Sequence, residues 1–335
     1  MEDRVAPLLL DWYAAHARRL PWRAPPGSPA PDPYRVWLSE VMLQQTTTAA
    51  VAPYFRKFAE TWPDVAALAA APEEDVMAAW AGLGYYSRAR NLVAAARAVA
   101  QRGSFPDTEE ELRGLPGLGA YTAAAVAAIA FGRRAVVVDA NVERVVARLF
   151  AITEPMPGAR KAIRTAADAI TPQDRSGDFA QAMMDLGATI CTPRDPRCLL
   201  CPLADPCRAR AQGRQAELPV RAPKKAKPLR TGTAWWIERA GQVLLVTRPP
   251  SGLVGGMRAL PDDGWSAQGD GSGGVGGELL GMVRHTFTHL TLELQVRTAT
   301  APAGDAEGEW WPIERLDEAG LPTLFAKAAR LALAR

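Results

Sequence analysis

Cysteine is scarce in this sequence and confined to one short segment. The 335 residues include four cysteines, Cys191, Cys198, Cys201 and Cys207, with the spacing C-x6-C-x2-C-x5-C. Four soft thiolates packed this closely, with none elsewhere, fit one metal site better than scattered core residues. The pattern therefore predicts a metal-binding loop over 191–207, with disulfides and free thiols as alternatives.

The spacing of the thiols bears on which metal they would hold. Four thiolates suit either a tetrahedral zinc ion or a [4Fe–4S] cluster. Zinc knuckles usually supply two C-x2-C pairs, whereas this loop has one, formed by Cys198 and Cys201. The unequal gaps of six and five residues allow the loop to surround a bulky cubane cluster. The spacing matches neither the bacterial nor the plant-type ferredoxin pattern. We expect a [4Fe–4S] cluster ligated by all four cysteines, with zinc as the main alternative.

Long apolar runs are also missing. No run reaches the length of about 20 residues that spans a membrane, and the opening segment MEDRVAPLLLDWYAAHARRL is amphipathic rather than a signal peptide. We therefore expect a cytoplasmic protein with no membrane partner. A reducing compartment makes disulfides a weaker alternative for the four thiols.

A strong excess of one charge is absent as well, but the charge is uneven. Residues 1–230 carry 30 Lys and Arg against 24 Asp and Glu, while residues 231–335 carry 9 against 12. Five of the basic residues fall in 221–230. This basicity permits nucleic-acid binding.

The chain is longer than one ordinary core, so we expect two domains. Residues 1–213 place apolar side chains at three- and four-residue spacing, which predicts an all-α domain. Proline makes the segment 24–33 an exposed loop. The expected helices cover 34–50, 64–70, 73–81, 86–101, 119–131 and 141–151.

The pattern changes after residue 213. Residues 214–231 combine prolines with like charges and are expected to form a basic linker. Residues 232–335 are expected to form a small α+β domain, with a glycine-rich loop over 264–278. Its predicted elements are strands over 233–239, 242–248 and 291–299 and a closing helix over 321–334.

The segment LPGLG, 115–119, predicts a tight turn between two helices. Gly117 and Gly119 permit a close backbone approach, and free amides at the start of the next helix could grip a DNA phosphate without reading sequence. A plain turn between helices with a glycine cap is the alternative.

Several motifs together resemble one family. The stretch LPGLGAYTAAAV, followed by VVDANVERV and then by the four cysteines, resembles the helix–hairpin–helix DNA glycosylase superfamily. The segments PYRVWLSEVMLQQTTT, GLGYYSRARNL and QAMMDLGATIC narrow the resemblance to the MutY-type adenine DNA glycosylases. The likeness covers residues 8–210 and resumes weakly over 231–335, which resembles a MutT/Nudix fold.

Two carboxylates within these motifs have different surroundings. Glu40 lies in a helix among apolar neighbours, so desolvation should favour its protonated form. Asp139 follows a β-branched run and precedes a helix, so we expect an N-cap that favours the charged form. Glycosidic bond cleavage requires such a pair. A surface glutamate and an aspartate that only caps are the alternatives.

The resemblance implies the roles of three residues. Glu40 matches the residue that protonates a ring nitrogen of adenine, and Asp139 matches the residue that stabilises the sugar cation. Tyr121 stands where lyase-competent relatives have a lysine, so no Schiff base can form. The family pattern implies that its hydroxyl bonds Asp139. Together these residues imply a monofunctional enzyme.

The resemblance also implies how the mispair is found. The base must leave the duplex before acid catalysis can reach it. Gln44, Gln45, Thr46 and Tyr85 match residues that enter the helix around the 8-oxoguanine opposite the adenine. For Gln44 and Gln45, ordinary solvated helix surface is the alternative. The expected adenine pocket also includes Arg23 and Gln181.

In 232–335 the glutamate run that binds metal in Nudix hydrolases is missing, so pyrophosphatase activity is not expected. The segment HTFTHL matches a loop that contacts 8-oxoguanine, which assigns lesion recognition to Phe287, Thr288 and His289. Two departures from the family are Ala140, where glycine usually follows the aspartate, and Val254, where tryptophan is common.

The expected partner is double-stranded DNA containing adenine opposite 8-oxoguanine or guanine, bound by a monomer. The expected activity is hydrolysis of the adenine N-glycosidic bond in base excision repair. The first alternative is an endonuclease III-type glycosylase and lyase. The second is a non-catalytic DNA-binding cluster protein.

Overall fold

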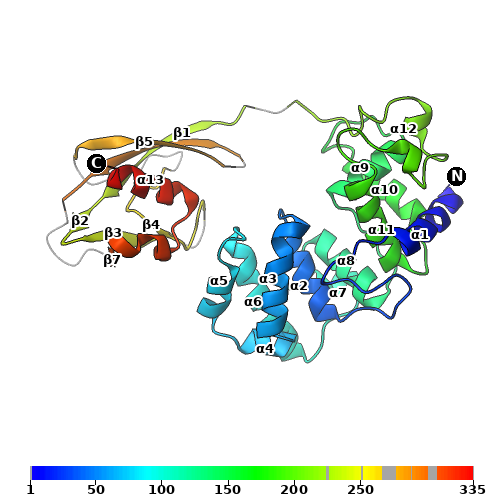
Figure 1. Ribbon diagram of the computed structural model, residues 1–335, viewed down its shortest axis with the longest axis horizontal. Helices are drawn as coiled ribbons and strands as arrows, with labels where there is room; N and C mark the ends of the chain where they lie inside the picture. Colours follow the sequence, from blue (N-terminus) through cyan, green and yellow to red (C-terminus); the bar gives the residue numbers. More distant parts are fainter. Residues whose placement is uncertain are drawn as a thin grey trace. The chain divides into compact units, whose positions relative to one another are not determined.

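The computed structural model describes residues 2–223, 226–249, 252–265, 277–287, 289–300 and 308–334. It divides into two compact units, Met1–Pro223 and Lys224–Arg335, which Figure 1 colours from blue to green and from yellow to red. We call them the helical unit and the sheet unit. The expected classes, all-α followed by a small α+β fold, are confirmed.

The helical unit consists of helices joined by turns and by longer loops. In chain order they are α1 (Val5–His16), α2 (Pro33–Leu43), α3 (Thr48–Thr61), α4 (Val65–Ala70), α5 (Glu73–Trp80), α6 (Tyr86–Arg102), α7 (Glu109–Leu112), α8 (Ala120–Phe131), α9 (Ala140–Leu149), α10 (Arg160–Ile170), α11 (Ser176–Thr189) and α12 (Arg208–Ala211). Short 3₁₀ helices cover Glu2–Arg4 and Cys198–Leu200.

Helix α2 runs through the interior of this unit. Tyr34 and every residue from Val36 to Met42 are buried. Asp32 caps the helix by accepting a hydrogen bond from the Tyr34 amide at 2.7 Å, and Pro33 takes the first turn, where no helical hydrogen bond is lost. Because Glu40 lies within the buried run, the helix itself carries its carboxyl group into the interior.

Small side chains let three helices approach closely. Alanine dominates α8, whose residues from 122 to 130 are buried. Helix α11 packs against both α8 and α9, which lie beside it in Figure 1. A Cβ at Gly187 would lie 2.6 Å from the Asn141 Cβ, and one at Gly177 would overlap the Ala128 carbonyl. The two glycines therefore permit these crossings.

The helix predicted over 34–50 is two helices. α2 ends at Leu43 and α3 begins at Thr48. Thr47 caps α3 by accepting from the Ala50 amide at 3.3 Å, and Gln45 between them has a φ of 59°. A continuous helix is therefore wrong here, while the other predicted helices of this unit match α4, α5, α6, α8 and α9 closely.

The predicted linker over 214–231 is partly packed. Leu218 is buried, and its carbonyl accepts from Arg148 Nε at 3.0 Å. The Val220 carbonyl accepts from the Met156 amide at 2.9 Å. Since the units divide after Pro223, the first part of this segment belongs to the helical unit.

The sheet unit contains two sheets and a closing helix. β1 (Leu229–Trp236) is parallel to β6 (Thr291–Thr298), which is antiparallel to β5 (Leu279–Thr286). In the second sheet β3 (Gln242–Thr247) is antiparallel to β2 (Glu238–Arg239), β4 (Arg258–Ala259) and β7 (Glu309–Pro312). A 3₁₀ segment spans Ile313–Ala319, and α13 (Thr323–Leu333) packs on β5.

The predicted strands correspond to β1 with β2, to β3 and to β6, and the closing helix corresponds to α13. Strands β4, β5 and β7 were not predicted. Most of the glycine-rich segment 264–278 lies outside the described residues.

Candidate active site and cysteine pocket

The three side chains proposed for catalysis line one cleft of the helical unit. Its volume is about 980 Å³, and its walls include Glu40 from α2, Tyr121 from α8 and Asp139 at the start of α9. The walls also include Arg18, Trp22, Arg23, Leu43, Gln44, Gln45, Thr46, Gly117, Gly119, Asn141, Arg160, Arg164 and Met184. The two carboxylates therefore face the same space, from different helices.

Glu40 is a buried acid. Only 5% of the residue is exposed, and the Tyr121 hydroxyl donates to Glu40 Oε2 at 2.7 Å. Burial raises the pKa of Glu40 to about 7, against the lowering effects of the Tyr121 hydrogen bond and of Arg23, while Asp139 raises it further. The expected desolvation of this carboxyl group is confirmed, and a large fraction stays protonated near neutral pH.

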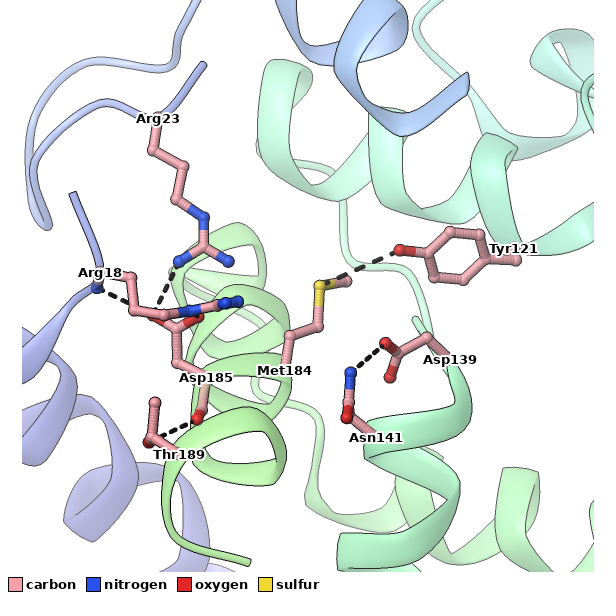
Figure 2. Close-up of polar contacts among 8 residues, drawn as sticks. All are labelled: Arg18, Arg23, Tyr121, Asp139, Asn141, Met184, Asp185 and Thr189. Carbon is pink, nitrogen blue, oxygen red and sulfur yellow. Dashed lines mark hydrogen bonds and ion pairs between the residues drawn. The ribbon is translucent and has the colours of Figure 1, made fainter. Parts of the chain in front are cut away.

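Asp139 has the opposite surroundings. It caps α9, with its Oδ1 accepting from the Val142 amide at 2.7 Å and its Oδ2 accepting from Asn141 Nδ2 at 2.9 Å. The second contact is drawn in Figure 2. Both oxygens thus accept hydrogen bonds at the N-terminus of a helix, where the helix dipole is positive. The predicted N-cap is confirmed, with Ala140 as the first helical residue.

Tyr121 contacts the other acid. The prediction that the Tyr121 hydroxyl bonds Asp139 is wrong, because this hydroxyl donates to Glu40 instead. The same hydroxyl lies 4.0 Å from the Met184 sulfur, as Figure 2 shows. Burial, reinforced by both carboxylates, raises the pKa of Tyr121 well above its ordinary value. The tyrosine is therefore a neutral donor fixed on Glu40.

The opposite wall of the cleft rests on a buried ion cluster that the sequence did not reveal. Asp185 is fully buried. It accepts from Arg18 Nε at 2.5 Å and from Arg23 Nη1 at 2.7 Å, as Figure 2 shows. Arg23 lines the cleft as expected, but Gln181 is not among its wall residues. Gln181 is buried and donates to the Gly177 carbonyl at 3.4 Å.

The hairpin glycines also reach the cleft. α7 ends at Leu112, and Gly119 is the N-cap of α8. Gly117 has a φ of 75°, and a Cβ there would lie 2.7 Å from the Asn91 Cβ. Glycine is therefore required at 117 for conformation and for space, and the hairpin opens the N-terminus of α8 beside the cleft.

Within the helical unit, the residues expected to contact the lesion lie in two turns. Gln44, Gln45 and Thr46 follow α2 and line the cleft. Gln44 Nε2 donates to the Thr122 hydroxyl at 3.1 Å, whereas Gln45 is exposed. Tyr85 precedes α6, is 52% exposed and has a φ of 51°. Gln45 and Tyr85 are thus exposed side chains on left-handed backbone.

The four cysteines line one small pocket, together with Arg148 of α9. Burial raises the pKa of Cys201 to about 12 and that of Cys207 in the same direction. Among the described residues, no three Cys, His, Asp or Glu side chains are grouped so that they could hold a metal ion. Four thiol groups lining one pocket form the kind of donor set that a zinc ion or a [4Fe–4S] cluster takes.

Two buried arginines of α9, which the sequence did not single out, contact this loop. Arg148 Nη1 donates to the Cys191 sulfur at 3.2 Å, and its carbonyl accepts from the Cys207 thiol at 3.6 Å. Arg144 donates to the Cys191 carbonyl at 2.7 Å and to Asn141 Oδ1 at 2.9 Å. Both arginines therefore tie the cysteine loop to α9.

The predicted recognition loop lies in the sheet unit. The Phe287 ring packs on Trp265 and on His285, and its carbonyl accepts from Lys227 Nζ at 2.7 Å. His289 is exposed. Thr288 lies outside the described residues. Val254 is partly buried with a φ of 49°.

Across the described residues, no helix is both long and apolar enough to cross a membrane.

Comparisons with known proteins agree with this architecture. Residues 38–172 match the HhH-GPD superfamily of base excision DNA repair proteins, and residues 233–331 match the NUDIX domain. A solved thermostable thymine-DNA glycosylase has a TM-score of 0.56 at 29% identity, covering 63% of this chain and 97% of that chain. Endonuclease III in a non-covalent DNA complex shares the fold, with a TM-score of 0.52 at 24% identity and coverage of 64% and 98%.

Curated relatives extend the likeness to nearly the whole chain. The adenine DNA glycosylase of Homo sapiens is 35% identical over 404 residues, which cover 96% of this chain and 73% of the human protein. The adenine DNA glycosylase of Mycolicibacterium smegmatis is 42% identical over 208 residues, covering 61% and 69%. This chain therefore belongs to the adenine DNA glycosylase family.

Proposed function

We propose that this protein removes adenine mispaired with 8-oxoguanine, and with guanine, from duplex DNA by acid-assisted hydrolysis of the N-glycosidic bond. One observation carries the proposal. A carboxyl group whose pKa is raised to about 7 and a carboxylate that caps a helix line the same cleft. Family membership supports adenine as the base that is released.

In this mechanism Glu40 is the proton donor. An adenine turned out of the duplex into the cleft receives the Glu40 proton on a ring nitrogen, so the bond between C1′ and N9 breaks with neutral adenine leaving. The Tyr121 hydroxyl holds Glu40 Oε2 and fixes the rotamer of the acid. The deprotonated Glu40 then takes a proton from the water that attacks C1′, which restores the acid.

Asp139 stabilises the positive charge that develops on the deoxyribose. Its two oxygens are held by the Val142 amide and by Asn141, so little reorganisation is needed as the sugar becomes cationic. In this proposal the Asp139 carboxylate also has the chemistry to form a transient covalent bond to C1′. Either route leaves an abasic site and an intact strand.

Strand cleavage through an imine is disfavoured, because position 121 is tyrosine and has no amine to attack C1′. The endonuclease III-type alternative is likewise not favoured by the curated relatives. The non-catalytic alternative leaves the paired acids unexplained.

Lesion recognition is assigned to both units. Gln45 is exposed and lines the cleft, and Tyr85 is exposed on the turn before α6. A glutamine amide can pair with a base edge, and an aromatic ring can fill a gap in the stack. Gly117 and Gly119 would bring the amides of α8 to a phosphate. In the sheet unit we assign 8-oxoguanine contacts to Phe287, Thr288 and His289. One chain supplies all of these residues, so a monomer suffices.

We also propose that Cys191, Cys198, Cys201 and Cys207 hold a [4Fe–4S] cluster. The shared pocket and the Arg148 contact to Cys191 support it. When bound, the cluster supplies a covalent anchor for the loop. Iron and sulfide assays on purified protein should give about four of each per chain, as that cluster's composition requires; zinc without sulfide would replace the proposal with the zinc alternative.

The activity is tested on a labelled duplex with adenine opposite 8-oxoguanine. The purified protein should release adenine and leave a strand that breaks only after hot alkali. Borohydride should trap no protein on the DNA. Nicking before alkali together with trapping would favour the lyase alternative, and unaltered DNA would favour the non-catalytic one.

A further inference from the structure

Arg88, which no motif argument singled out, occupies the space between the two exposed recognition turns. It lies on the first turn of α6 and is buried, with 9% of the residue exposed. Its guanidinium lies 5.3 Å from the Tyr85 ring centroid and 5.4 Å from that of Trp80. Nη1 donates to the carbonyls of Val41 (3.2 Å), Met42 (3.0 Å) and Gln44, and Nη2 reaches the Thr46 hydroxyl (3.4 Å) and the carbonyls of Leu83 (3.3 Å) and Gly84 (3.4 Å).

These acceptors belong to two separate turns. The first turn, 44–47, follows α2, whose last carbonyls lack helical partners and carry the negative end of the helix dipole. The second turn, 81–85, joins α5 to α6. One planar group is therefore bonded to both turns.

Each turn contains one residue whose backbone is in an unfavourable conformation. Gln45 has a φ of 59° and Tyr85 a φ of 51°, a region that non-glycine residues adopt only when their surroundings enforce it. Arg88 bonds the carbonyl on the N-terminal side of both residues, Gln44 and Gly84. The same guanidinium thus restrains the backbone at both exposed side chains.

We propose that Arg88 is a positioning residue that fixes Gln45 and Tyr85 relative to each other, so that both enter the duplex beside the lesion at once. This inference rests on the proposed function, because it assigns a purpose to two residues of its recognition surface. Holding both turns in the binding conformation before DNA arrives removes an ordering cost from the complex.

Lysine cannot replace this arrangement. An ammonium group is a point charge with three donors, whereas the guanidinium offers a planar fork that also stacks on rings. The second turn has another restraint, since the Tyr54 hydroxyl donates to the Ala81 carbonyl at 2.8 Å. Arg88→Lys should therefore loosen the relation between the turns without removing the turn itself.

The test compares Arg88→Lys with Arg134→Lys. Arg134 also bonds a carbonyl and a carboxylate, both of Asp168, but is not a wall residue of the cleft. The readouts are single-turnover adenine release at saturating protein, and affinity for duplexes carrying 2′-fluoro-2′-deoxyadenosine opposite 8-oxoguanine or guanine. Arg88→Lys should lower the affinity preference for 8-oxoguanine about tenfold, equivalent to about 1.4 kcal/mol, with the saturated rate little changed. Arg134→Lys should keep both.

A second pair of variants covers the case in which Arg88→Lys does not fold. Gly84 and Gly103 both have positive φ, 71° and 89°, and a Cβ at either meets nothing within 4 Å. Gly84→Ala strains the turn next to Tyr85 and should lower the same preference, whereas Gly103→Ala at the end of α6 should not.

The outcomes separate the two proposals. Wild-type protein that releases no adenine opposite 8-oxoguanine contradicts the proposed function. Active wild type with an unchanged preference in Arg88→Lys, or in Gly84→Ala where Arg88→Lys does not fold, overturns the inference. Equal losses of affinity for both duplexes, together with a lowered Tm, would overturn it as well, because that pattern reflects folding alone.

Discussion

The two units differ in what they bury. Among the described residues, the polar and charged ones that are buried as whole residues lie in the helical unit: Ser39, Glu40, Arg88, Thr122, Arg144, Arg148, Ser176, Gln181 and Asp185. The sheet unit has an ion pair with largely buried side chains, Arg248 with Asp262. The core of the sheet unit is apolar, built from residues such as Leu292, Leu294 and Phe325. Buried charge costs free energy, so it persists where a site requires it. The contrast agrees with our proposal that the chemistry takes place in the helical unit.

The largest effect should come from the buried acid. Glu40→Gln keeps the size of the side chain but removes its proton, so adenine release should fall by about 10²–10⁴-fold, while lesion duplex still binds. Single-turnover release and gel-shift affinity measure the two quantities. Glu110→Gln on α7 is the control and should leave both unchanged; normal turnover by Glu40→Gln would remove Glu40 from the mechanism.

A slightly smaller loss is expected from Asp139→Asn. Asparagine caps helices about as well as aspartate, so thermal unfolding should change little. The negative charge is lost, and the rate of adenine release should fall by about 10²–10³-fold, the range for removing one group that stabilises transition-state charge. A loss of rate that merely tracks a lowered Tm would mean that Asp139 acts only as a cap.

The sheet unit should give an effect on preference rather than on chemistry. His289→Ala should reduce the affinity advantage of 8-oxoguanine over guanine by about tenfold, or about 1.4 kcal/mol, with the saturated rate retained. Arg284→Ala, another exposed position of this unit, is the matched control. A large loss of the saturated rate in His289→Ala would contradict the proposal that the sheet unit contributes to recognition and not to chemistry.

Stability should depend on pH through Glu40. Its pKa is about 7 in the folded protein and 4.5 as the ordinary value. As pH rises between these values, the unfolded state loses its proton while folded Glu40 keeps it, so the folded state loses stability across this window and the loss levels off above about pH 7. Glu40→Gln should therefore increase the free energy of unfolding by roughly 1–3 kcal/mol at pH 8 relative to pH 5. Denaturant melts at both pH values check this, and an equal difference at both would contradict it.

The smallest effect should come from Tyr121→Phe. The lost hydroxyl lowers the pKa of Glu40 by hydrogen bonding, so its removal should raise that pKa. Adenine release, which needs the protonated acid, should then persist to higher pH, with the alkaline limb shifted by about one unit or less. A shift of the alkaline limb to lower pH would contradict the predicted rise in the pKa of Glu40.

The fold was largely accessible from the sequence because alanine-rich periodicity and turn residues mark the helices. The break after α2 was not predicted, since QQTTT has no glycine or proline. At the break, the Gln44 carbonyl accepts a hydrogen bond from Arg88, a residue more than 40 positions away. Strand β5 was missed because its pairing with β6, rather than its own alternation, defines it.

The site was accessible to the same extent. Glu40 and Asp139 lie in local patterns that reveal burial and capping, so their surroundings followed from the sequence. The partner of Tyr121 did not, because a choice between two acceptors depends on how α8 crosses α2. Asp185 looked like any helical aspartate in QAMMDLG, and only the tertiary fold brings Arg18 and Arg23 to it.

The glycine contacts of α11 have a consequence for how the protein tolerates change. Gly187 lets α11 touch Asn141, whose amide orients Asp139. A methyl group at position 187 would lie 2.6 Å from the Asn141 Cβ, so we expect Gly187→Ala to displace α11 or Asn141 and to lower adenine release, although it replaces no residue proposed for the chemistry. A mutation can therefore lower the activity of this protein without replacing any residue that takes part in the reaction.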